Sequence, residues 1–127
     1  MTPSSSQVQK QIRSQVDEVD PAEVRRQIGN GAVLIDVREN EEFAAGHIPG
    51  ATNIDWNSPE FERRVSELDK SKTYLVHCAA GGRSAKASDR LTKLNFSSVY
   101  NLEGGMKAWA AQGLPVVRDD GTPGEVI

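Results

Sequence analysis

The single cysteine of this chain, Cys78, opens a segment of small residues that ends in an arginine and a serine. The segment reads Cys78-Ala79-Ala80-Gly81-Gly82-Arg83-Ser84. Such a loop lets backbone N–H groups converge on one point, and a helix that starts there adds partial positive charge. A thiol at that point ionises more easily than a free cysteine, and the thiolate is a good nucleophile. The pattern therefore predicts an enzyme in which Cys78 attacks an anionic substrate.

The other residues of the segment have side chains that suit an anion site. Arg83 offers a planar, permanently charged fork that fits a sulfonate, sulfate or phosphate. Ser84 can cap the next helix or donate its hydroxyl into the pocket. Ala79, Ala80, Gly81 and Gly82 allow the backbone to wrap closely around a bound atom. A cysteine at a strand end can also be a small buried apolar residue, but the order of residues after Cys78 favours chemistry.

The elements that position this segment are a buried strand before it and a helix after it. Residues 73–77 have the composition of a strand and residues 84–94 that of an amphipathic helix. A second buried strand is predicted over 32–37, where apolar and β-branched residues run without a break. Ligands of parallel sheets bind outside the carboxyl ends of the strands, and Cys78 directly follows one such end.

Strands and helices alternate along the whole chain. The alternation predicts an α/β domain with a mostly parallel central sheet of about five strands and helices on both faces. The predicted organisation is a flexible segment over 1–14, the domain over 15–118 and a flexible tail over 119–127. Further strands are expected at 16–19, 51–54 and 98–101, and further helices at 20–28, 39–45, 58–68 and 106–112.

Composition narrows the class of protein. The chain has 127 residues, 37% of them apolar, and a net charge of −3. This size and composition suit one globular domain, and the charge argues against nucleic acid as a partner. No apolar run approaches the roughly 18 residues that span a bilayer, and no signal peptide is evident. We therefore expect no membrane partner and, with a single cysteine and no disulfide framework, a cytoplasmic protein.

Three stretches of the sequence resemble signatures of the rhodanese-like family. One runs from Asp36-Val37-Arg38 through Glu42-Phe43 to residues 46–54, which read Gly-His-Ile-Pro-Gly-Ala-Thr-Asn-Ile. The second is the cysteine segment itself. The third is Gly104-Gly105-Met106-Lys107-Ala108-Trp109 with Gly113-Leu114-Pro115-Val116. They occur in the family's order and spacing and cover about residues 15 to 117.

The resemblance implies a single-domain sulfurtransferase. Cys78 is then expected to take the outer sulfur of a donor such as thiosulfate, release sulfite and carry a persulfide, which a thiol, cyanide or an acceptor protein discharges. The N–H groups from Ala79 to Ser84 are expected to stabilise the thiolate and the persulfide, and Arg83 to hold the donor's oxygens. No metal or organic cofactor is expected.

Several residues outside the segment are candidates for a supporting role. Asp36 and Arg38 are expected to brace neighbouring loops as a charge pair. His47 is expected to brace the Gly-His-Ile-Pro-Gly turn, although a histidine can also be a general base. A structural role is expected for His77, with tuning of the thiol as the alternative, and a surface role for Arg63 and Arg64, with positive potential near the substrate as the alternative. Trp109 is expected to pack the last helix.

Two other functions compete with sulfur transfer. The cysteine phosphatase signature also reads His-Cys followed by Arg-Ser, but with five residues between cysteine and arginine, whereas Cys78 and Arg83 are separated by four. The shorter loop suits a sulfane sulfur better than a tetrahedral phosphate. Non-catalytic rhodanese-type modules that bind or regulate partners are the other alternative, and the intact cysteine segment argues against it.

Overall fold

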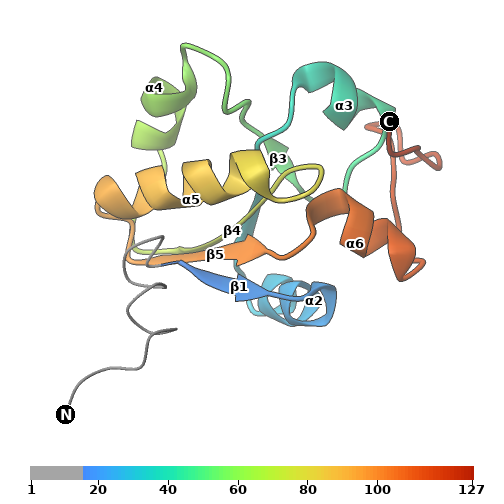
Figure 1. Cartoon of the computed structure of the whole chain (residues 1–127), viewed down its shortest axis with the longest axis horizontal. Helices are drawn as coiled ribbons and strands as arrows, with labels where there is room; N and C mark the ends of the chain where they lie inside the picture. Colours follow the sequence, from blue (N-terminus) through green and yellow to red (C-terminus); the bar gives the residue numbers. More distant parts are fainter. Residues whose placement is uncertain (1–15) are drawn as a thin grey trace.

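The computed structural model describes residues 16–127, which form one parallel five-stranded sheet with helices on both faces (Figure 1). The strand order is β1-β5-β4-β2-β3, and every neighbouring pair is parallel. The strands are β1 Asp17–Val19, β2 Val33–Asp36, β3 Thr52–Asn53, β4 Thr73–His77 and β5 Ser98–Leu102. The helices are α2 Pro21–Gly29, α3 Asn40–Ala45, α4 Phe61–Ser66, α5 Gly82–Lys93 and α6 Gly105–Ala111. The predicted α/β fold is confirmed, while the segment 1–14, predicted to be flexible, lies outside the described residues.

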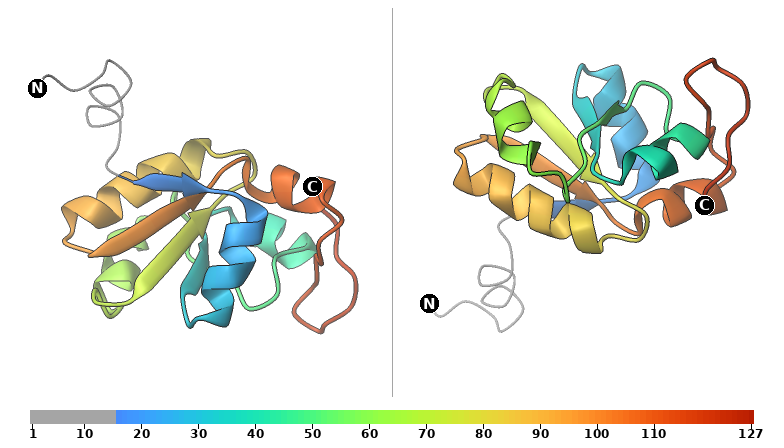
Figure 2. Two further views of the ribbon diagram at one scale, coloured as in Figure 1. Left: turned by 90° about the horizontal axis from the view of Figure 1, so that it is seen from below. Right: turned by 90° about the horizontal axis from the view of Figure 1, so that it is seen from above.

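Helices lie against both faces of the sheet (Figure 2), and an apolar cluster packs between sheet and helices on each face. Because successive strand residues point to opposite faces, β2 and β4 contribute alternate side chains to each cluster. On the face covered by α4 and α5 the buried residues include Ile35, Val76, Cys78, Phe61, Val65 and Leu91. On the face covered by α2 and α6 they include Leu34, Leu75, Leu102, Val24, Met106 and Trp109.

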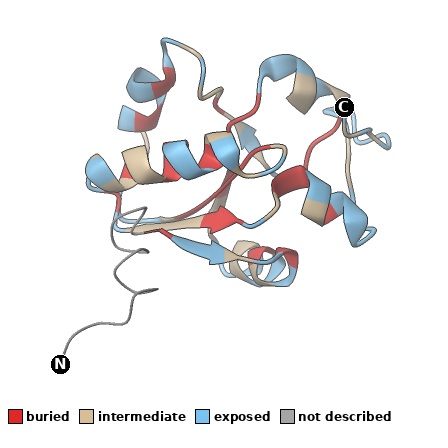
Figure 3. Ribbon diagram, in the orientation of Figure 1, coloured by how far each residue is buried: buried red, intermediate tan, exposed pale blue. Residues whose placement is uncertain are grey.

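The central position of β2 and β4 follows from their continuous apolar sequences. Both strands are buried over nearly their whole length (Figure 3). Their register pairs Asp36 with His77, and the N–H of Val37 donates to the carbonyl of His77 at 2.9 Å. The residues that follow the two strands therefore emerge side by side at the carboxyl edge of the sheet, and Cys78 is one of them.

Two of the predicted helices have different bounds in the structure. The helix expected over 58–68 is α4, Phe61–Ser66, because the Ser58 hydroxyl accepts from the N–H of Glu60 and holds a turn ahead of the helix. The helix expected from Ser84 begins two residues earlier, at Gly82, since Ala85 N–H already donates to the carbonyl of Gly81. The earlier start places Gly82, Arg83 and Ser84 of the cysteine segment in the first turn of α5.

The C-terminal segment, predicted to be a flexible tail over 119–127, returns to the domain in the structure. The N–H of Glu125 donates to the carbonyl of Ala45 at 2.9 Å, and Val117 pairs with His47 in both directions. A Cβ at Gly46 would lie 2.5 Å from the carbonyl oxygen of Glu125. Gly46 therefore permits a close backbone approach that ties the segment to the end of α3.

Leu75 of β4 is fully buried, so truncation of its side chain should lower the free energy of unfolding strongly. Leu75→Ala should lower the free energy of unfolding by about 2–5 kcal/mol, because it leaves a cavity between the sheet and α2. Leu94→Ala, at the half-buried C-cap of α5, is the matched control and should cost clearly less. Urea unfolding followed by circular dichroism measures both, and equal losses would contradict the assigned register.

Candidate active site

The thiol of Cys78 lies at the carboxyl end of β4, between the strand and the start of α5. Its side chain belongs to the α4/α5 face of the sheet, together with Val76, and the residue is only 1% exposed. Gly81, which precedes α5, has φ +123°, a conformation that side chains rarely adopt. This glycine turns the chain sharply enough for the loop to close over the sulfur.

Hydrogen-bond donors converge on the sulfur of Cys78. The N–H of Gly81 donates to Sγ at 3.1 Å. Burial raises the pKa of the thiol, but the Ser84 hydroxyl and the N–H groups of Ser84, Gly81 and Ala80 outweigh it, so the pKa lies below its ordinary value. The hydroxyl proton of Ser84 can serve only one acceptor, and the carbonyl of Gly81 lies 3.3 Å from the same oxygen. A charged thiolate is the stronger acceptor of the two.

The start of α6 fixes the loop from its other side. The N–H groups of Met106 and Lys107 donate to the carbonyls of Cys78 and Ala79 at 2.9 and 3.1 Å. Gly105, with φ +56°, allows this approach: a Cβ there would lie 2.3 Å from the Cys78 carbonyl oxygen. Since the C=O and N–H of a peptide point in opposite directions, this anchoring turns the next N–H groups away from α6 and toward the loop interior.

Arg83 is engaged by an acid from another helix. Its Nη1 and Nη2 donate to the two carboxylate oxygens of Glu42 on α3, at 2.6 and 3.0 Å. The hydrogen bonds from Arg83 lower the pKa of Glu42, and the carboxylate in turn raises the pKa of Arg83. The side chains are 28% and 19% exposed, so the pair lies at the surface beside the loop.

Asp36, the last residue of β2, and Arg38 form a buried charge pair, the pairing that the sequence predicts for the bracing of loops. Neither side chain is exposed, and Arg38 Nη2 lies 2.7 Å from the Asp36 carboxylate. The same nitrogen donates to the carbonyl of Gly46 at 2.8 Å. The pair therefore links the end of β2 to the end of α3, the helix that carries Glu42.

The two histidines lie away from the thiol. His77 is paired in register with Asp36, and its Nε2 is 3.6 Å from that carboxylate. Strand alternation puts its ring on the face opposite the Cys78 side chain. His47 Nδ1 donates to the carbonyl of Phe43 at 2.8 Å, and the two rings stack at 3.8 Å. The geometry favours the expected bracing role of His47 over that of a base.

The remaining candidates make structural contacts. Trp109 is buried and donates from Nε1 to the carbonyl of Pro115 at 2.8 Å. Arg63 pairs with Glu60 and Glu67 on the surface of α4. Arg64 donates to the carbonyl of Asn53 at 3.0 Å.

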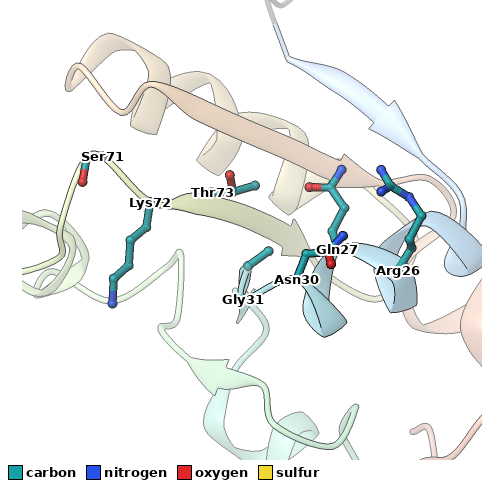
Figure 4. Close-up of a pocket in the computed structure, with 8 residues that line it drawn as sticks. Arg26, Gln27, Asn30, Gly31, Ser71, Lys72 and Thr73 are labelled. Carbon is teal, nitrogen blue, oxygen red and sulfur yellow. The ribbon is translucent and has the colours of Figure 1, made fainter.

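Three further kinds of feature could support binding in the described residues: metal-ligand clusters, membrane-spanning helices and cavities. Residues 16–127 contain no group of three or more His, Cys, Asp or Glu side chains placed to hold a metal. No helix among them is long and apolar enough to cross a membrane. A polar cavity of about 480 Å³ lies between α2 and the start of β4, with Gln27, Asn30 and Lys72 in its lining (Figure 4). It is at the amino end of the sheet, opposite the end that carries Cys78.

Comparison with protein families identifies the class of protein to which this geometry belongs. The family described as rhodanese-like domain matches residues 20–112. The chain is therefore a member of the rhodanese-like domain family, and the match lies within the predicted domain, residues 15–118.

Relatives from bacteria carry sulfur-transfer names. A protein named sulfurtransferase from Allochromatium vinosum is 32% identical over 108 residues, which cover 84% of this chain and 99% of the relative. The thiosulfate sulfurtransferase GlpE of Ectopseudomonas mendocina is 33% identical over 98 residues, covering 77% and 88% of the two chains.

Solved structures of family members have the same fold. A rhodanese-related protein from Thermoplasma volcanium superimposes with a TM-score of 0.72 at 33% identity, covering 80% of this chain and 97% of that protein. The polysulfide-sulfur transferase homodimer from Wolinella succinogenes gives a TM-score of 0.72 at 28% identity, with 89% and 85% covered.

Sequence reasoning assigned no role to two residues that shape the site. Glu42 and Gly105 belong to the family signatures, but neither was given a role of its own. Glu42 accepts hydrogen bonds from Arg83, and Gly105 allows α6 to approach the loop closely. A glycine pair that follows shortly after a predicted strand was the available signal for Gly105. No such signal pointed to Glu42 as the partner of Arg83, because the two residues are 41 positions apart in the sequence.

The close approach of α6 predicts that Gly105→Ala disrupts the site. Its Cβ would collide with the Cys78 carbonyl, so we expect loss of stability and slower alkylation of Cys78 by iodoacetamide at neutral pH. Gly113→Ala is the matched control, since Gly113 has φ +70° but open space around it. It should cost about 1 kcal/mol of unfolding free energy and leave alkylation unchanged. Equal effects of both substitutions would show that only backbone strain matters.

The hydroxyl of Ser84 predicts the pH dependence of thiol reactivity. The rate of Cys78 alkylation should fall as pH drops through the lowered thiol pKa, because only the thiolate reacts. Ser84→Ala removes a donor to the thiolate, so the inflection should move to higher pH. Ser88→Ala removes a buried hydroxyl one turn further along α5 and should leave the inflection in place. An unchanged profile in Ser84→Ala would exclude a hydrogen bond to the thiolate.

Proposed function

We propose that this protein is a sulfurtransferase in which Cys78 carries the transferred sulfur as a persulfide. The observation that carries the proposal is the set of donors around Sγ: the Gly81 N–H at 3.1 Å and the Ser84 hydroxyl, in a loop held by α6. Relatives named sulfurtransferase, at about one third identity over most of this chain, support the same activity.

The first half-reaction loads the thiol. The Cys78 thiolate attacks the outer sulfur of thiosulfate, the new S–S bond forms, and the old S–S bond breaks with its electron pair leaving on sulfite. The persulfide keeps the negative charge at its outer sulfur. Loop N–H groups from Ala79 to Ser84 then stabilise that sulfur as they stabilise the thiolate.

The second half-reaction requires an acceptor from outside the chain. With Cys78 the single cysteine of the sequence, no internal thiol can resolve the persulfide. A thiol, cyanide or an acceptor protein attacks the outer sulfur, and the Cys78 thiolate is regenerated. The cycle uses two substrates in turn and no metal or organic cofactor.

The spacing of Cys78 and Arg83 separates this reaction from phosphate chemistry. Four residues lie between them, one fewer than in the cysteine phosphatase signature. The loop already places the Gly81 N–H within hydrogen-bond distance of the sulfur. A pocket this tight suits one added sulfur atom better than a tetrahedral phosphate.

Thiosulfate treatment followed by intact-protein mass spectrometry tests the proposal. The wild type should gain one sulfur atom that is removed by cyanide as thiocyanate, and Cys78→Ser should gain none. Hydrolysis of an aryl phosphate should be negligible in both. Absence of an adduct with thiosulfate, a thiosulfonate and an organic persulfide would instead favour a binding module, and Cys78-dependent phosphatase turnover would favour the phosphatase alternative.

A further inference from the structure

The guanidinium of Arg83, which is expected to bind the sulfur donor, is already paired with the carboxylate of Glu42. Each terminal nitrogen of Arg83 donates one hydrogen bond to an oxygen of Glu42, so the carboxylate lies against the guanidinium and offsets its charge. Glu39, at the start of the same helix, also acts electrostatically on Arg83. The loop therefore presents a nearly neutralised guanidinium next to the negative charge of the Cys78 thiolate.

Glu42 is held in place independently of Arg83. It is the third residue of α3, and its carboxylate also accepts from the N–H of Glu39 at 3.1 Å in a capping box. The helix itself is tied to the core, because the Gly46 carbonyl at its end accepts from buried Arg38. The Glu42 carboxylate is thus held in position to bind Arg83 by its own helix.

Charge then decides which donors suit the site. Thiosulfate is a dianion, and its oxygens must either displace the Glu42 carboxylate from Arg83 or bind beside two negative groups. A thiosulfonate is a monoanion with the same kind of terminal sulfur, and an organic persulfide has no oxyanion group at all. The electrostatic penalty scales with the charge of the donor.

Resting on the sulfurtransferase function proposed above, we propose that Glu42 is a specificity-determining residue: by occupying Arg83 it disfavours dianionic donors relative to sulfane donors of lower charge. The chemical step is the same for every donor. Cys78 forms a bond to the terminal sulfur, and sulfite, a sulfinate or a thiolate leaves with the electron pair of the broken S–S bond. Sulfur-loaded thiols and monoanionic thiosulfonates are accordingly the donor class that the site favours.

Glu42→Gln tests the inference, because glutamine keeps the capping-box acceptor while it removes the charge. We expect kcat/KM for thiosulfate to rise about tenfold and that for benzenethiosulfonate about threefold, since the penalty follows donor charge. The ratio of the two values should therefore rise about threefold. Glu41→Gln, an exposed neighbour on α3, is the matched control for net charge and should leave the ratio unchanged.

A second background shows whether Glu42 acts through Arg83. With Arg83→Gln added to Glu42→Gln, the donor ratio should return to about its wild-type value, because no guanidinium is left free and the local charge is again that of the neutral pair. A wild-type ratio in Glu42→Gln, a shift equal to that of Glu41→Gln, or a ratio that stays raised in the double variant would each overturn the inference while the sulfurtransferase function stands. Wild-type protein that loads sulfur from neither donor would overturn both.

Discussion

The chemistry proposed for this protein depends on two backbone hydrogen bonds that α6 gives to the loop after β4. Met106 and Lys107 satisfy the carbonyls of Cys78 and Ala79. With the Ala79 carbonyl turned to α6, the N–H of the same peptide, that of Ala80, faces the other way and acts on the sulfur, and the turn at Gly81 adds the Gly81 N–H beside it. A loop whose carbonyls faced the sulfur would instead raise the thiol pKa, whatever its side chains. The reactive thiol is therefore a product of loop orientation more than of loop composition.

The parts of the fold that the sequence predicted are those governed by local chemistry. Apolar runs predicted β2 and β4, and the small residues between Cys78 and Ser84 predicted a loop that enters a helix. The bounds of α4 and α5 were wrong because single hydrogen bonds, at Ser58 and Gly81, decide where these helices begin. Such bonds shift an end by a turn and leave no trace in apolar periodicity.

The parts of the site that were not predicted depend on contacts between distant segments. Gly105, at the start of α6, is required because a Cβ there would collide with the carbonyl of Cys78, which lies in the loop between β4 and α5. Glu42 matters because α3 is set beside α5, and the buried pair of Asp36 and Arg38 helps to set it there through the Gly46 carbonyl. Strand alternation already sets His77 on the face opposite Cys78, but its neighbour Asp36 depends on the register between β2 and β4, which the sequence does not give.

The pairing of Arg83 with Glu42 lowers the positive charge that the loop offers to an anionic substrate. In the sequence, an arginine at the end of a small-residue loop counts as one free positive charge for the substrate. In the structure, a bidentate carboxylate has already engaged that charge, so any anionic donor competes with a partner that is held by its own helix. In the proposed reaction the loop N–H groups, of which that of Gly81 already donates to Cys78 Sγ, bind the transferred sulfur. Binding of the transferred atom and response to the donor's charge are then assigned in the proposal to different groups, and the second can change without disturbing the first.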